Sequence, residues 1–140
     1  MSTRSVLLPV AVALSPLATA DVHTVDPDGG ADFISFQSAV THAVDGDVII
    51  LMGGDYGLGN LGVSGKGFTL IAAPDADLDL QRVSIKNLPP GSSFYGFNLE
   101  PYDLVIEDCD GAVRMQDCFL QGGVQVWGSA DVSLSRCRMW

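Results

Sequence analysis

A spacing of about twenty residues recurs along most of this chain, and it constrains the fold more than any other feature. The segments VSIKNL, LVIEDC and VQVWGS begin at residues 83, 104 and 124, so their alternating apolar residues repeat at offsets of 21 and 20, and Val63 is expected to begin this series. A second series runs through VIIL, FTLI, FYGFNL, VRMQDCFL and VSLSRCRM and aligns Ile50, Leu70, Phe94, Met115 and Leu134. Two series with one period indicate a coiling chain that lays down at least two strands per turn.

An antiparallel sandwich also places strands about every ten residues. It would not keep the same residue types aligned over four successive repeats. A parallel solenoid does so, because each turn stacks on the last at a strand spacing of about 4.8 Å. The sequence therefore predicts an all-β parallel solenoid over residues 47–140.

Charged residues follow the same period. Basic residues fall 19 or 21 positions from acidic ones in three cases, Arg82 with Asp103, Lys86 with Glu107, and Arg136 with Asp117. Stacking of the turns would place each pair side by side on the outer face. Such neighbouring-strand pairs contribute about 0.2–1 kcal/mol each, which opposes a slip in register.

One short amphipathic segment precedes the strands, within residues 21–46. From Phe33 to Val44, apolar residues fall at helical spacings, with Asp32 or Ser35 available as N-cap. The first turn of a solenoid has no predecessor to cover its core and unpaired backbone. This segment is predicted to be a capping helix, and Asp45-Gly46-Asp47 is predicted to turn the chain into the first strand.

Residues 1–20 have the pattern of a cleaved signal peptide. Arg4 precedes an apolar stretch from Val6 to Leu14, and Ala18-Thr19-Ala20 matches a small-residue cleavage site. Pro9 and Pro16 interrupt the stretch, which is shorter than the ~20 apolar residues of a membrane span. The chain is predicted to be exported, to the cell surface, the periplasm or the medium, without membrane insertion.

The acidic composition excludes some classes of partner. The net charge is −10 for the whole chain, and removal of Arg4 with the leader makes the exported chain more acidic still. Nucleic-acid binding depends on neutralising phosphates with Lys and Arg, so no nucleic-acid partner is expected. The acidity is compatible with solubility or with divalent-cation binding.

The opening GGADFISFQSAVTHAVDGDVIILMGGDY resembles the entry motif of the pectin lyase-like right-handed parallel β-helix proteins. Ten positions match that motif, namely Phe33, Gln37, Ala39, Val40, Ala43, Gly46, Asp47, Ile49, Gly54 and Tyr56. The resemblance implies a right-handed coil. It also implies a carbohydrate-related role, because the group includes polysaccharide lyases, esterases and hydrolases as well as non-catalytic secreted proteins. Pectin methylesterases in it use a Gln-Asp pair, which Gln116 and Asp117 match, but their further Asp and Arg motifs are absent from this sequence.

The candidate binding residues lie late in the chain. Lyases of this group hold Ca²⁺ with carboxylates, so the acidic patch of Glu107, Asp108 and Asp110 is a candidate metal site, with Arg114 the nearby base that lacks a stacking partner. Trp127 replaces the position of Lys86 and Glu107 in the repeat, so it should face outward, where it can stack on a sugar ring. Trp127 and Arg114 are therefore the candidate carbohydrate contacts.

Other polar and sulfur residues have structural interpretations. Asp75, Asp77 and Asp79 alternate with apolar residues, as on the outer face of a strand, and their spacing fails the EF-hand pattern at its sixth and twelfth positions. Cys118 and Cys137 share one slot of the repeat and are either buried thiols or a disulfide, whereas Cys109 has no partner. His23 and His42 are expected to be isolated surface residues of the cap.

Two functions of different class remain. The first is a non-catalytic surface or carbohydrate-binding solenoid. The alternative is the N-terminal part of an enzyme acting on an acidic polysaccharide such as pectin, with catalytic residues beyond residue 140. The sequence VSLSRCRMW stops inside a strand, which predicts a fragment of a longer solenoid or an end covered by another chain.

Overall fold

The computed structural model describes residues 19–57, 59–78, 80–99, 103–129 and 131–139. Most of the predicted leader, Asp79 and the C-terminal Trp140 lie outside the described residues. The sequence prediction of a parallel solenoid is confirmed, with about four turns and one short helix.

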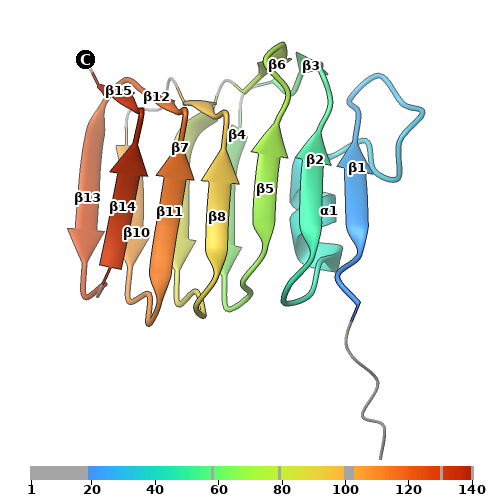
Figure 1. Cartoon of the computed structure of the whole chain (residues 1–140). Coiled ribbons are helices and arrows are strands. Elements are labelled where there is room, and N and C mark those ends of the chain that lie inside the picture. The colour runs from blue at the N-terminus through green and yellow to red at the C-terminus, as the bar shows by residue number, and fades with distance from the viewer. Residues whose placement is uncertain (1–18, 58, 79, 100–102, 130, 140) are drawn as a thin grey trace, which may run out of the picture.

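The strands form stacked parallel sheets (Figure 1). The largest sheet consists of β1 (Val22–Val25), β2 (Val48–Leu51), β5 (Thr69–Ala72), β8 (Ser92–Tyr95), β11 (Ala112–Gln116) and β14 (Asp131–Ser135). Behind it lie β4 (Gly59–Ser64), β7 (Leu80–Lys86), β10 (Asp103–Glu107) and β13 (Gly123–Trp127). A short strand follows each front strand from β2 onward, namely β3 (Gly54–Asp55), β6 (Ala76–Asp77), β9 (Asn98–Leu99), β12 (Phe119–Leu120) and β15 (Arg138–Met139).

The coil is right-handed. In Figure 1 the front strands run upward, the rear strands run downward, and successive turns are added toward the left. This is the hand that parallel crossover connections nearly always take.

The core is a set of apolar stacks inside the coil. Strands point alternate residues inward, and the inward residues of the inner turns are almost completely buried. Leu70, Phe94 and Met115 stack in the front sheet, and Ile85 and Ile106 stack in the rear sheet. The predicted series are therefore the core of the molecule.

Two alignments in the first turns were wrong by one or two residues. Leu70 stacks on Ile49 rather than Ile50, and Val83 stacks on Leu61 rather than Val63. The segment VIIL is apolar on both faces, so its alternation does not reveal which residues point inward. The pairing of β4 with β7 also contains an irregularity at Gly59 and Asn60, which changes the spacing between these turns.

The cap forms as predicted but over a shorter range. Helix α1 spans Phe36–His42, with Ser35 at the N-cap position and no side-chain capping bond. Phe33 lies outside it, in a parallel bridge with Val25, and Val44 is 59% exposed rather than on the apolar face. Helix α1 packs against β1, β2 and β4, and its Gln37 amide donates to the carbonyl of Gly62 in β4. It therefore covers the edge at which the rear sheet begins.

The rear strands end in a column of residues with left-handed backbone. Gly65, Asn87, Asp108 and Gly128 follow β4, β7, β10 and β13 and have φ between 51° and 71°. The amides of Gly65, Asn87 and Asp108 each donate to a carbonyl of the next turn, at 2.9–3.2 Å. The acceptor is in each case the last residue of the next rear strand, namely Lys86, Glu107 and Trp127. Gly, Asn and Asp tolerate this conformation better than other residues do.

Asn87 gives a direct test of this column. Replacement of Asn87 by Ala is expected to destabilise the fold by about 1 kcal/mol, because Ala pays the left-handed penalty without local hydrogen bonding, whereas Asn87→Gly should be neutral or stabilising. Urea denaturation of both variants checks the difference. Equal losses for Ala and Gly would show that the Asn87 side chain, rather than the backbone conformation, is what matters.

Candidate functional site

The outer face of the rear sheet carries a shallow trough that runs across the strands. Outward residues of β4, β7, β10 and β13 form three parallel rows in the strand register. The middle row is Gly62, Ser84, Val105 and Gln125; the flanking rows are Asn60, Arg82, Asp103 and Gly123, and Ser64, Lys86, Glu107 and Trp127. We call this surface the outer trough. The part of it formed by β7, β10 and β13 contains a groove of about 440 Å³.

The middle row of the outer trough has no side chain at its cap end, where Gly62 lies on β4. A Cβ atom added at Gly62 would contact nothing within 4 Å. Neighbouring strands are about 4.8 Å apart, so the four strands give the trough a length of roughly 14 Å.

Trp127 stands at the last strand of the trough with 62% of its surface exposed. Its register neighbour is Glu107, which forms an ion pair with Lys86 one turn earlier. Both members of that pair are partly exposed. The row therefore presents an aromatic face, a carboxylate and an ammonium side by side.

Arg82 lies in the opposite row, on β7. The backbone register places it beside Asp103 as predicted, but these two side chains form no ion pair in the described structure. The predicted alignment of Arg82 with Asp103 is therefore confirmed, but the predicted ion pair between them was wrong. Arg82 is exposed and lines the groove, where its guanidinium can donate hydrogen bonds to a ligand.

The two predicted carbohydrate contacts lie on different faces. Trp127 belongs to β13 in the rear sheet, whereas Arg114 belongs to β11 in the front sheet. Arg114 lines a separate hollow of about 290 Å³ with the Pro90–Ser93 turn. A single ligand in the outer trough does not reach both residues.

The predicted metal ligands are spread over a strand end. Glu107 is paired with Lys86, Asp108 occupies the left-handed turn column, and Asp110 is exposed beyond it. Among the described residues, no three His, Cys, Asp or Glu side chains are grouped closely enough to hold a metal ion. The Ca²⁺ site stays a prediction from the sequence.

Gln116 and Asp117, the Gln-Asp pair that resembles the one in pectin methylesterases, form hydrogen bonds with each other and with Arg136. The Gln116 amide donates to the Asp117 carboxylate at 3.3 Å, and Arg136 of the next turn donates two hydrogen bonds to that carboxylate at 2.7 and 2.8 Å. These bonds from Arg136 are the main reason that the pKa of Asp117 is lowered. The predicted stacking of Asp117 on Arg136 is confirmed.

Asp75 and Asp77 face outward as predicted, and Asp79 lies outside the described residues. Asp75 and Asp77 are exposed, while the intervening Ala76 and the following Leu78 are buried. Asp77 pairs in register with Asp55 of the preceding turn.

The predicted isolation of the two histidines was wrong, although His42 is exposed as predicted. His23 is not isolated: its ring lies 5.6 Å from that of His42, and its Nε2 atom is 2.9 Å from Asp47 Oδ2. The His23 side chain is 13% exposed and the Asp47 side chain 2%. Because β1 pairs with β2, residues 24 apart in sequence meet at the base of the cap.

The cysteines are free thiols in the structure. Cys118 and Cys137 occupy equivalent positions before β12 and β15, as predicted. Burial, with a smaller contribution from the neighbouring Cys137, raises the pKa of Cys118 to about 12 against the opposing effect of backbone hydrogen bonds. Such a thiol is protonated at neutral pH and is a poor nucleophile.

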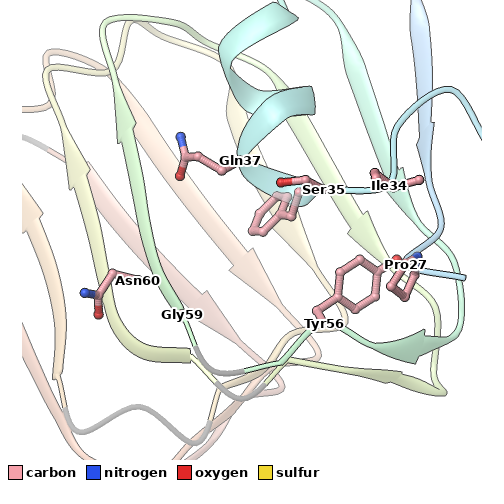
Figure 2. Close-up of a pocket in the computed structure, with 8 residues that line it drawn as sticks. Pro27, Ile34, Ser35, Gln37, Tyr56, Gly59 and Asn60 are labelled. Carbon is pink, nitrogen blue, oxygen red and sulfur yellow. The ribbon is translucent and has the colours of Figure 1, made fainter.

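A second hollow of about 240 Å³ lies between the cap and the first turn (Figure 2). Tyr56 forms one wall beside Pro27, while Gln37 and Asn60 approach from α1 and β4. The Tyr56 hydroxyl is 2.8 Å and 2.9 Å from the carbonyls of Met52 and Val25. Burial, together with the charges of Asp26 and Asp75, raises the pKa of Tyr56 to about 12, so this hydroxyl serves the packing of the cap.

Searches for similar proteins found no matching family model, no matching curated protein and no matching solved structure. Within the described residues, no helix has the length and apolar character needed to cross a bilayer. The geometry of the outer trough is therefore the main basis for an inference about function.

Proposed function

We propose that the protein is an exported β-solenoid that binds polysaccharide non-catalytically along the outer trough. The observation that carries the proposal is the exposed Trp127 ring at the end of a row of polar side chains. A sugar ring has an apolar face and a rim of hydroxyl groups. An exposed indole can stack on the apolar face, and the hydroxyl groups need hydrogen-bonding side chains beside the indole.

The side chains around Trp127 supply those hydrogen bonds. Gln125 can both donate and accept, Ser84 has a hydroxyl, and the Lys86–Glu107 pair offers a donor and an acceptor. Arg82 adds a planar donor that suits the carboxylate of an acidic sugar. These contacts support an acidic polysaccharide as the preferred ligand.

Export is part of the proposal. It is supported by the leader-like residues 1–20, and it would bring the trough into contact with extracellular polysaccharide. The resemblance of the entry motif to pectin lyase-like proteins supports the same setting. The last described turn also leaves core positions open, with Val126 45% and Met139 62% exposed, so further solenoid turns or another chain are the proposed partner there.

Binding can be tested by affinity electrophoresis through gels containing acidic or neutral polysaccharides. We expect retardation by an acidic polymer, and we expect Trp127→Ala to weaken binding by about 5- to 150-fold, since loss of one stacking contact is worth about 1–3 kcal/mol where rings stack on aromatic side chains. Trp127→Phe should retain part of the affinity.

Arg114→Ala is the matched control, because Arg114 is an exposed residue of the opposite sheet. Its retardation by the polymer, measured against its own mobility in a gel without polymer, should equal that of the parent protein. Equal retardation of the parent and Trp127→Ala would contradict binding in the trough. Shortening of the polymer during the assay would instead support the alternative function, a polysaccharide-degrading enzyme.

A further inference from the structure

Asp47 is a deeply buried carboxylate with an unusual set of partners. The residue is 1% exposed, and it lies between α1 and β2 at the base of the cap. Its Oδ2 accepts a hydrogen bond from the Val44 amide at 2.9 Å and lies 2.9 Å from His23 Nε2. Its Oδ1 accepts from the backbone nitrogen of Asp21 at 3.0 Å.

None of these partners carries a fixed positive charge in the uncut chain. A buried carboxylate is stabilised further when a countercharge joins its hydrogen bonds. Two of its partners are neutral amides, and His23 supplies a positive charge only in its protonated form.

The Asp21 nitrogen is held in place by its own strand pairing. The carbonyl of Asp21 accepts a hydrogen bond from the Val48 amide at 2.9 Å, and β1 begins at the next residue. Thr19 and Ala20, on the other side of this nitrogen, are exposed and belong to no strand or helix. The bond between Ala20 and Asp21 is thus the last accessible link before the fold, and it coincides with the end of the Ala18-Thr19-Ala20 motif.

We propose that Asp47 is a receptor for the α-ammonium group that cleavage after Ala20 would create on Asp21. Hydrolysis of this amide consumes one water, leaves a carboxylate on Ala20 and a protonated amine on Asp21. The new charge appears 3.0 Å from Asp47 Oδ1 without movement of the nitrogen. The inference rests on the export cleavage proposed above, and it adds that processing locks the cap.

Other charged groups around this turn have different contacts. Asp45 accepts a hydrogen bond from the Gly67 amide, and Lys66 donates to the Thr41 carbonyl at the end of α1. The ring of His42 lies against the ring of His23. Asp21 also carries a side-chain carboxylate next to its own backbone nitrogen. None of these contacts places a cation on Asp47 Oδ1 in the described structure.

The test compares three chains that differ only at the N-terminus, beginning at Asp21, at Ala20 and at Met1. Each is made with Asp47 and with Asp47→Asn, and thermal unfolding is followed from pH 6.5 to pH 10. The chain beginning at Ala20 has the same ammonium group displaced by one residue, about 3.3 Å along the strand direction. It is therefore the matched control.

We expect the chain beginning at Asp21 to melt about 3–8 °C above the other two at pH 6.5. An amine that gains a carboxylate partner has a raised pKa in the folded state, so its stabilisation is complete below the ordinary range of about 7.7–8.0 and is lost as the pH rises through the folded-state value. The advantage should shrink toward pH 10 and should be absent with Asp47→Asn.

Equal melting temperatures for the Asp21 and Ala20 chains at pH 6.5 would overturn the receptor. So would an advantage that persists at pH 10. If Asp47→Asn does not fold, Nα-acetylation of the Asp21 chain replaces it, because the acetyl group removes the charge and keeps the N–H donor; acetylation should abolish the advantage, and its failure to do so would also overturn the proposal. N-terminal sequencing of the exported protein tests the cleavage separately: Asp21 as first residue supports it, and any other residue contradicts the export site without bearing on the melting comparison.

Discussion

Replacement of Ile106 by Ala is expected to lower the free energy of unfolding by about 2–5 kcal/mol. Ile106 is 0% exposed and stacks between Ile85 of the preceding turn and Val126 of the following one. The turns above and below are fixed by their own hydrogen-bond ladders, so they cannot collapse into the cavity. The cost should therefore include the cavity as well as the lost burial.

Urea denaturation followed by circular dichroism measures this loss, with Val105→Ala as the control. Val105 is the adjacent residue of β10 and points to the outer trough. It should cost less than about 1 kcal/mol, as expected for a substitution away from the core. Equal losses at the two positions would contradict the inward and outward assignment of this strand.

The second large effect is expected at Asp47. Asp47→Ala removes the acceptor of the Asp21 and Val44 amides and of His23, which leaves buried donors without partners. Breaking a buried polar arrangement of this kind costs about 3–5 kcal/mol. Thermal unfolding at neutral pH should show a correspondingly large fall in Tm.

The same carboxylate gives the stability a dependence on acid. Burial would raise the pKa of Asp47, but the hydrogen bonds from the Val44 amide, His23 and the Asp21 amide outweigh it and hold the pKa below its ordinary value of 3.8. A lowered pKa means that the stabilisation is present above about pH 3.8 and is lost as the pH falls through the lower folded value. The parent protein should thus lose part of this stabilisation at strongly acid pH, whereas Asp47→Ala should show no such loss from this site.

Asp45→Ala is the matched control for this prediction. Asp45 lies in the same turn, is exposed, and accepts one hydrogen bond from the Gly67 amide. Its loss should cost about 0.5–1.5 kcal/mol, the value of a single hydrogen bond. A loss at Asp45 as large as that at Asp47 would contradict the central role of the buried carboxylate in the cap.

The repeat could be predicted from the sequence because stacking places like residues on like residues. From Leu70 onward, each predicted alignment of the front series agrees with the strand register. The outward orientation of Trp127 followed from the same alignment. The period was less informative in the first turns, where VIIL is apolar on both faces and β4 pairs irregularly with β7.

The parts of the site that depend on several turns at once were not predicted. The outer trough is defined by the row of Gly62, Ser84, Val105 and Gln125, four residues of different types with no common chemical signature. The pairing of His23 with Asp47 depends on β1 lying beside β2, within a region expected to form only the cap. A repeated spacing of 26 between Val22 and Val48 was the available signal, but two short strands do not establish a period.

The most direct test of polysaccharide binding in the outer trough is a fluorescence titration of Trp127. The chain has two tryptophans, so a Trp140→Phe variant makes Trp127 the single reporter. Titration with the acidic polysaccharide that retards the protein in gels should give a saturable change in Trp127 emission, with a midpoint equal to that of binding. Binding at the same concentration with unchanged Trp127 emission would place the ligand elsewhere on the solenoid and would contradict the proposed site.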